Sequence, residues 1–87
     1  MTVTIEFFGI PRLRAGVTKI DIEASDIKEA LDSVSEILPV WSEHCMKDGC
    51  LKPEYLMNIN GTQFCTDENE KLESGDCLLI FSADVGG

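Results

Sequence analysis

Hydrophobic and polar residues alternate with a period of two at the start of the chain and follow a helical period after it. Residues 2–7 alternate, so we predict a strand with Val3, Ile5 and Phe7 on one face. Residues 17–23 alternate in the same way and predict a second strand. The chain therefore opens with two strands that each have one apolar side.

The segment between these two strands carries turn-forming residues. Gly9, Pro11 and Gly16 interrupt the alternation, and Arg12 and Arg14 lie among them. We expect a hairpin with a long, loose turn here.

A helical pattern follows. Asp26 and Glu29 have the spacing of a capping box, and Ser25 is an alternative N-cap. Pro39 ends the predicted helix. One apolar stripe recurs at helical spacing and is expected to face the core: Ile27, Ala30, Leu31, Val34, Ile37 and Leu38.

Residues 40–54 are less regular. Trp41 lies where a short second helix is expected to begin, and Gly49 and Pro53 indicate a loop after it. The role of this segment stays open.

The remaining strands come from three short apolar segments. Residues 55–60 predict a third strand, and Asn60-Gly61 is a strong signal for a tight turn. Residues 62–65 are expected to return as a short strand. Residues 77–81 are nearly all apolar, which is typical of a buried strand.

This order of elements predicts one α+β domain over residues 1–87, with a flexible tail at residues 82–87. One main helix should cover one face of a mixed sheet of four to five strands. A right-handed crossover places the last strand parallel to the first, at the centre of the sheet. That is the β-grasp, or ubiquitin-like, topology.

Charge narrows the expected partners. The net charge of −9 argues against nucleic acid, whose binding depends on Lys and Arg. It suits a basic protein partner, although solubility alone explains it equally well. The sequence shows neither a signal peptide nor a membrane-spanning segment, so we expect a cytoplasmic protein that does not bind membranes.

The four cysteines do not form a recognisable metal motif. Cys65 and Cys77 lie in strand-like contexts, where a free thiol acts as a small hydrophobic group. His44, Cys45 and Cys50 offer soft ligands, but their spacing fits neither a zinc site nor an iron–sulfur site. We expect no metal, and the roles of Cys45 and Cys50 stay open.

The sequence ends in Gly86-Gly87. Glycines add backbone entropy and no packing, so they are poor material for a folded element. One interpretation is a frayed end. The other is a slender tail whose Gly87 carboxylate enters a narrow active site of another protein.

Together these features resemble the ubiquitin-like sulfur carriers, the MoaD/ThiS family, and most closely its molybdopterin synthase small-subunit branch. The resemblance covers nearly the whole chain. It rests on Phe7-Phe8, the Gly16 turn, Leu31 and Leu38, Asn60-Gly61, the Leu72 to Asp76 turn, the final apolar strand and Gly86-Gly87.

The resemblance implies an activation cycle with no cofactor bound to the chain itself. An adenylating enzyme related to ubiquitin-activating enzymes uses ATP to form a glycyl adenylate at Gly87. A sulfur donor protein then displaces AMP and leaves a C-terminal thiocarboxylate, that is, 1-thioglycine. The large subunit of molybdopterin synthase, or an equivalent acceptor, receives the sulfur. The chain has no self-contained active site and is expected to act as the sulfur-donating subunit.

Strand parity predicts where partners dock. If Phe7 faces the helix, Phe8 faces away, and Leu79 and Phe81 lie on the same open face. The three form an apolar patch suited to a protein contact, unless residues 40–54 cover it. In the tail, we expect Val85 to anchor by apolar contact and Asp84 to mark its exposed start.

The residues before Gly86 depart from the family pattern, and alternatives stay open. Molybdopterin synthase small subunits commonly have a Pro-Pro pair here, whereas this chain has Ser-Ala-Asp-Val at 82–85. The acceptor could instead belong to thiamine, cysteine or other sulfur metabolism. Two other classes also fit: a ubiquitin-like modifier joined to target lysines, and a non-covalent β-grasp interaction module.

Overall fold

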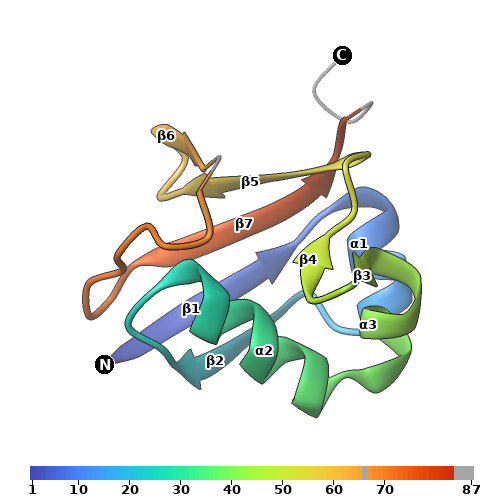
Figure 1. Cartoon of the computed structure of the whole chain (residues 1–87), viewed down its shortest axis with the longest axis horizontal. Helices are drawn as coiled ribbons and strands as arrows, with labels where there is room; N and C mark the ends of the chain where they lie inside the picture. Colours follow the sequence, from blue (N-terminus) through green and yellow to red (C-terminus); the bar gives the residue numbers. More distant parts are fainter. Residues whose placement is uncertain (66, 84–87) are drawn as a thin grey trace.

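The computed structural model describes residues 1–65 and 67–83 (Figure 1). None of the helices in these ranges is long and apolar enough to cross a membrane. The elements of the described chain are β1 (Thr2–Phe7), α1 (Gly9–Ala15), β2 (Lys19–Glu23), α2 (Ile27–Ile37), α3 (Pro39–Cys45), β3 (Met46–Lys47), β4 (Cys50–Leu51), β5 (Tyr55–Ile59), β6 (Gln63–Cys65) and β7 (Cys77–Ser82).

Five strands form a mixed sheet in the order β2-β1-β7-β5-β6. β1 and β7 are parallel, with Phe7 beside Ile80, and the other neighbouring strands are antiparallel. The prediction that the last strand pairs parallel with the first at the centre of the sheet is confirmed. β3 and β4 form a separate two-stranded hairpin.

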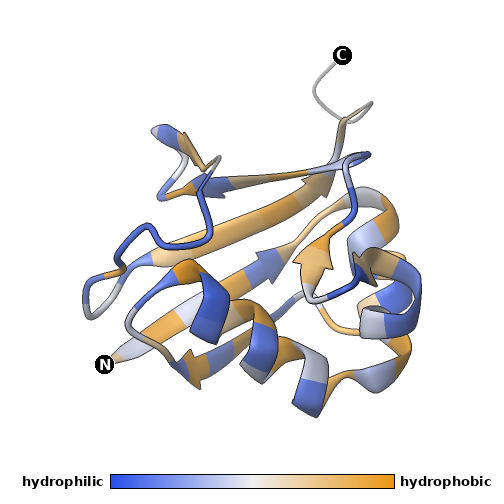
Figure 2. Ribbon diagram, in the orientation of Figure 1, coloured by the Kyte–Doolittle hydropathy of each residue, from blue (hydrophilic) through white to orange (hydrophobic). Residues whose placement is uncertain are grey.

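The hydrophobic core lies between the sheet and α2, as the alternation predicts. Val3, Ile5 and Phe7 are at most 1% exposed, and Leu78 and Ile80 on β7 are fully buried. Figure 2 shows β7 apolar along most of its length, whereas α2 carries hydrophilic residues on its outer side. The buried side of α2 consists of Ile27, Ala30, Leu31 and Val34.

The ends of α2 follow the capping prediction with two differences. The Asp26 carboxylate accepts a hydrogen bond from the Glu29 backbone N–H at 2.8 Å, so Asp26 is the N-cap. Glu29 in turn accepts from the N–H of Ser25, one residue before the cap. Ile37 was expected in the buried stripe but is 54% exposed, because the helix ends there. The prediction that the helix stops before Pro39 is confirmed, because α2 ends at Ile37 with Leu38 as its C-cap, and Pro39 begins α3.

The loose turn predicted between the first two strands is wrong, because residues 9–15 form the helix α1. Proline is compatible with a first helical turn, where its missing N–H is not needed, and Pro11 is buried there. Gly16 has a φ of 74° and donates its N–H to the Arg12 carbonyl at 3.0 Å. Gly9 and Gly16, which the sequence indicated as turn residues, are therefore the first residue and the C-cap of a helix. The following strand begins at Lys19, later than predicted.

Residues 40–54 are more ordered than the sequence indicated. The short helix expected near Trp41 is confirmed as α3, but the expected loop after it is the β3–β4 hairpin. Asp48 and Gly49 turn that hairpin with φ values of 54° and 81°. Asn60 and Gly61 have φ values of 57° and 75°, which confirms the second tight turn.

Candidate functional site: the open sheet face and the end of β7

The central strand β7 is the last strand of the described chain. It was expected to end at Phe81, but Ser82 still pairs with Tyr55 and is 4% exposed, so Ser82 belongs to the sheet and not to the predicted tail. Ala83 donates its N–H to the Glu54 carbonyl at 3.0 Å. The predicted tail residues Asp84, Val85, Gly86 and Gly87 lie outside the described residues.

The structure brings the three predicted docking residues onto one side of the sheet. Leu79 and Phe81 alternate with the buried Leu78 and Ile80, so they point to the face that α2 does not cover. Phe8 donates its N–H to the Ile80 carbonyl at 2.9 Å, which continues the β1–β7 ladder and places Phe8 beside Phe81. All three side chains are partly exposed.

Two further apolar residues extend this surface, and the sequence analysis missed both. Leu56 on β5 lies opposite Phe81, and Phe64 on β6 is 60% exposed. The rings of Phe64 and Phe81 lie 6.1 Å apart. The sequence contained a signal for Leu56: strand residues alternate between the two faces, so the assignment of Met57 and Ile59 to the core side places Leu56 on the open side. We call the five residues Phe8, Leu56, Phe64, Leu79 and Phe81 the open-face patch.

Residues 40–54 were the alternative cover for this surface, and they pack elsewhere. Trp41 in α3 is fully buried, and its ring centroid lies 5.7 Å from that of Phe7 on the core side of the sheet. α3 packs against α1 and α2. The segment therefore closes the core rather than the open face.

The β1–β2 half of the open face is polar. Thr4 donates its hydroxyl to Asp21 at 2.6 Å, and Thr2 donates to Glu23 at 2.9 Å. The N-terminal ammonium lies 2.8 Å from Glu23, and its hydrogen bond is the main reason that the pKa of this carboxyl is lowered. The open face thus divides into a polar half and the open-face patch.

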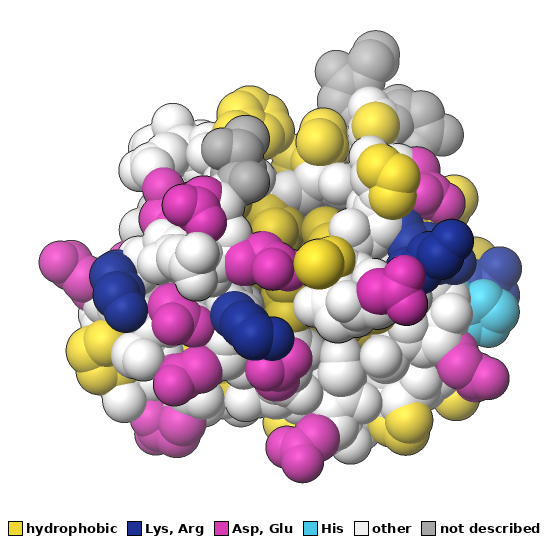
Figure 3. Space-filling view, viewed as in Figure 1, with side chains coloured by type: hydrophobic (Ala, Val, Ile, Leu, Met, Phe, Trp, Pro, Cys, Tyr) yellow, Lys and Arg dark blue, Asp and Glu magenta, His cyan; other side chains and the backbone are white. Residues whose placement is uncertain are grey.

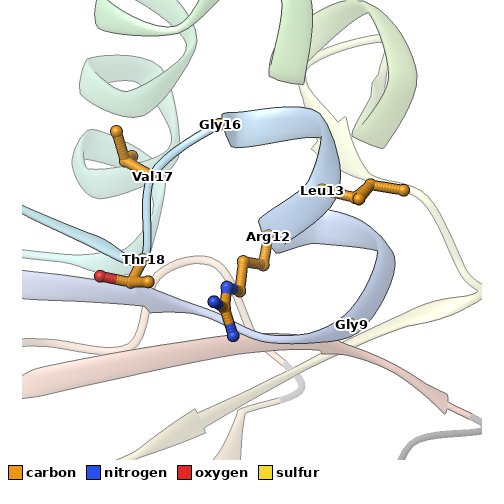
Figure 4. A pocket seen from close by; sticks show the side chains of 6 residues that line it. All are labelled: Gly9, Arg12, Leu13, Gly16, Val17 and Thr18. Carbon is orange, nitrogen blue, oxygen red and sulfur yellow. The ribbon is translucent and has the colours of Figure 1, made fainter.

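Residues of α1 contribute to two pockets. One, of about 350 Å³, is lined by Ile10, Glu54, Tyr55, Ser82 and Ala83, where the described chain ends. The other, of about 480 Å³, lies along α1. Figure 4 shows Arg12 and Leu13 leaving this helix on different sides. Arg12 supplies the only charged side chain among the residues that line it: Gly9, Arg12, Leu13, Gly16, Val17 and Thr18. The smaller pocket holds one carboxylate, Glu54, together with the Tyr55 and Ser82 hydroxyls.

The thiols keep their protons at neutral pH. The pKa of Cys65 is raised to about 12, mainly by burial and secondly by the neighbouring Glu70 carboxylate. Burial and then Glu6 also raise the pKa of Cys77. Cys50 and Cys65 line a hollow of about 440 Å³, and the Glu68 carboxylate raises the pKa of Cys50. Across residues 1–65 and 67–83, no three His, Cys, Asp or Glu side chains are grouped so as to hold a metal ion.

Comparison with known proteins identifies the fold. No protein-family model and no curated protein matches the sequence. Small archaeal modifier protein 1 from Haloferax volcanii superimposes with a TM-score of 0.86 at 21% identity, covering 100% of both chains. The protein has the β-grasp fold.

Other β-grasp structures that match this chain were solved as complexes. The chain matches a structure titled as the BexX/CysO complex of Amycolatopsis orientalis with a TM-score of 0.79 at 20% identity, covering 98% of this chain and 99% of that one. It also matches the complex of subunits 1 and 2 of the molybdopterin-converting factor from Helicobacter pylori, with a TM-score of 0.65 at 21% identity and coverage of 94% and 93%.

Proposed function

We propose that this protein is a ubiquitin-like sulfur carrier whose C-terminal Gly87 is converted to a thiocarboxylate. The observation that carries the proposal is the course of β7. This central strand carries Leu79 and Phe81 of the open-face patch and ends at Ser82, so a protein docked on the patch lies beside the last described residues before Gly87. The similarity to CysO and to a molybdopterin-converting factor subunit supports the same class of function.

The chemistry requires enzymes other than this chain. A carboxylate resists nucleophilic attack, so an oxygen of Gly87 first attacks the α-phosphate of ATP and releases pyrophosphate. Sulfide (HS⁻) delivered by a donor protein then adds to the acyl carbon, AMP leaves with the electrons of the acyl–oxygen bond, and loss of the S–H proton leaves the thiocarboxylate. Activation splits one difficult step into two easier ones. Glycine allows the backbone to approach the nucleotide without a Cβ clash.

The open-face patch supplies the docking surface in this proposal. Phe64 and Phe81 form an aromatic pair beside Leu56, and aromatic anchors of this kind often dominate binding energy. The net charge of −9 favours fast encounter with a basic partner. The two matched complexes support the use of this fold in protein–protein recognition.

We propose molybdopterin as the destination of the sulfur, with the large subunit of molybdopterin synthase as acceptor. The match to subunit 1 of a molybdopterin-converting factor supports this choice. Residues 82–85 lack the expected proline pair. For that reason acceptors in thiamine or cysteine synthesis remain the competing destinations.

A second candidate function is covalent protein modification. It is favoured by the superposition on a small archaeal modifier protein over the full length of both chains. In that case the activated Gly87 carbonyl would be attacked by a lysine amine of a target, and an isopeptide bond would form. Both functions share the adenylation step.

The test is the intact mass of the purified protein after incubation with the adenylating enzyme of its own organism, ATP and sulfide. We expect one oxygen to be replaced by sulfur at Gly87. Gly87→Ala should impair this reaction while its thermal melt stays unchanged. Thiocarboxylate formation by the Ala variant at the native rate contradicts the proposal. Conjugates to lysines of target proteins, without sulfur transfer, would support the modifier instead.

A further inference from the structure

One polar residue lies buried in the middle of the open-face patch. Asn58 on β5 alternates with Met57 and Ile59, which face the core, so its side chain belongs to the open face. In the register of the sheet it lies between Leu79 on β7 and Phe64 on β6. Asn58 is nevertheless only 7% exposed, on a face that no helix covers.

The aromatic pair explains this burial. β5 lies between β6 and β7, so the contact between Phe64 and Phe81, with ring centroids 6.1 Å apart, crosses over β5. Because Phe64 is directly opposite Asn58 and Phe81 is opposite Leu56, the two rings meet above the Asn58–Leu56 side of that strand. The rings therefore form a cover over the carboxamide.

The covered carboxamide is not satisfied within the described chain. Its Oδ1 atom is buried and accepts no hydrogen bond from the described residues. A buried acceptor without a partner destabilises the fold, and an apolar residue of similar shape would avoid this cost. The cover itself is easily moved, because Phe64 is 60% exposed on the three-residue edge strand β6.

We propose that the Asn58 carboxamide is the hydrogen-bond acceptor by which the open-face patch recognises its docking protein. This inference rests on the proposed function. The occupant is the adenylating enzyme, which presents one N–H or O–H donor among apolar side chains on a basic surface. Docking turns the Phe64 ring aside, and the donor then satisfies Oδ1. The net charge of −9 is opposite in sign to that basic surface. Because Oδ1 accepts no hydrogen bond within the described chain, the partner supplies the donor.

The experiment compares two variants of nearly identical shape, Asn58→Val and Asn58→Thr. Both are β-branched and suit a strand, but only Thr keeps an acceptor. We expect Asn58→Val to raise the Tm by about 4–8 °C and to weaken binding to the purified adenylating enzyme of the same organism about tenfold. Asn58→Thr should bind about three- to tenfold more tightly than Asn58→Val.

Thr4→Val is the matched control on the same face. It removes a hydroxyl that already donates to Asp21, in the polar half of the sheet, and should leave the Kd unchanged. Equal affinity of the Val and Thr variants, or native affinity of Asn58→Val, overturns the inference. If the wild-type protein still gains a thiocarboxylate in that case, the proposed function stands. A wild-type protein that is neither bound nor adenylated by this enzyme rejects both.

Discussion

Both faces of the sheet carry apolar and aromatic side chains, which are buried on one face and partly exposed on the other. On the covered face, Phe7 and Ile80 are at most 1% exposed beneath the helices. On the open face, Phe64 is 60% exposed and Leu56 is 37% exposed, and no helix of the described chain covers them. The central strand β7 contributes apolar residues to both faces. The covered face therefore stabilises the fold, and the open face is available for binding.

The charged surface supports the same division. Figure 3 shows Asp and Glu side chains spread over the side of the molecule that carries α2. On α2 itself, Lys28 and Asp32 form an exposed i,i+4 pair at 3.6 Å. Such pairs contribute little to stability. The charged side chains of α2 therefore face solvent, whereas the open-face patch presents the apolar side chains of Phe64 and Leu56.

The largest effect should come from the covered face. Trp41→Ala removes a fully buried ring that contacts Phe7, and we expect a loss of about 3–5 kcal/mol in the free energy of unfolding. Phe64→Ala is the counterpart on the open face and should cost less than about 1 kcal/mol. Denaturant unfolding followed by circular dichroism measures both, because Trp41→Ala removes the one tryptophan of the sequence. Equal losses would remove the distinction between the two faces.

Phe81→Ala should separate binding from stability. The residue is partly exposed and lies between Phe8 and Leu56 within the open-face patch. We expect partner affinity to fall by about 2 kcal/mol, roughly thirtyfold, because central aromatic residues commonly act as hot spots. Calorimetric titration with the adenylating enzyme gives the affinity. Unfolding of the variant at room temperature would instead place Phe81 in the core.

A smaller effect is expected at the helix that closes the covered face. Asp26→Ala removes the N-cap of α2 and its hydrogen bond to the Glu29 N–H, at a cost of about 1 kcal/mol. Asp32→Ala removes an exposed carboxylate from the same helix and should stay within about 0.5 kcal/mol of the native protein. Chemical denaturation distinguishes them. If the two variants lose the same stability, the capping bond contributes nothing.

The smallest effect concerns alkaline pH. Cys65 lies beside Met57, and its pKa is raised from 9.0 to about 12, chiefly by burial. The folded state therefore holds this proton more tightly than the unfolded state. The stability that results is fully present below pH 9 and is lost as the pH rises toward about 12. Melting curves over this range should fall less steeply for Cys65→Ala. An unchanged slope would show that the thiol titrates alike in both states.

The sequence alone determined most of the sheet and the main helix. Period-two alternation fixed which side of β1 is buried, and the spacing of Asp26 and Glu29 located the start of α2. Asn60-Gly61 located one tight turn. These features depend on residues close together in the chain, so local pattern was sufficient to predict them.

Only the tertiary structure decided the features that depend on distant residues. The sequence indicates a turn at Gly9, Pro11 and Gly16, whereas in the structure these residues belong to or cap α1, which packs against α3 and β7. The aromatic cover over Asn58 could not be predicted, because Phe64 and Phe81 meet only through the strand order β7-β5-β6. The sequence established that β7 is apolar on both sides. Which side is free to bind depends on where α2 and α3 pack, and long-range contacts alone determine that.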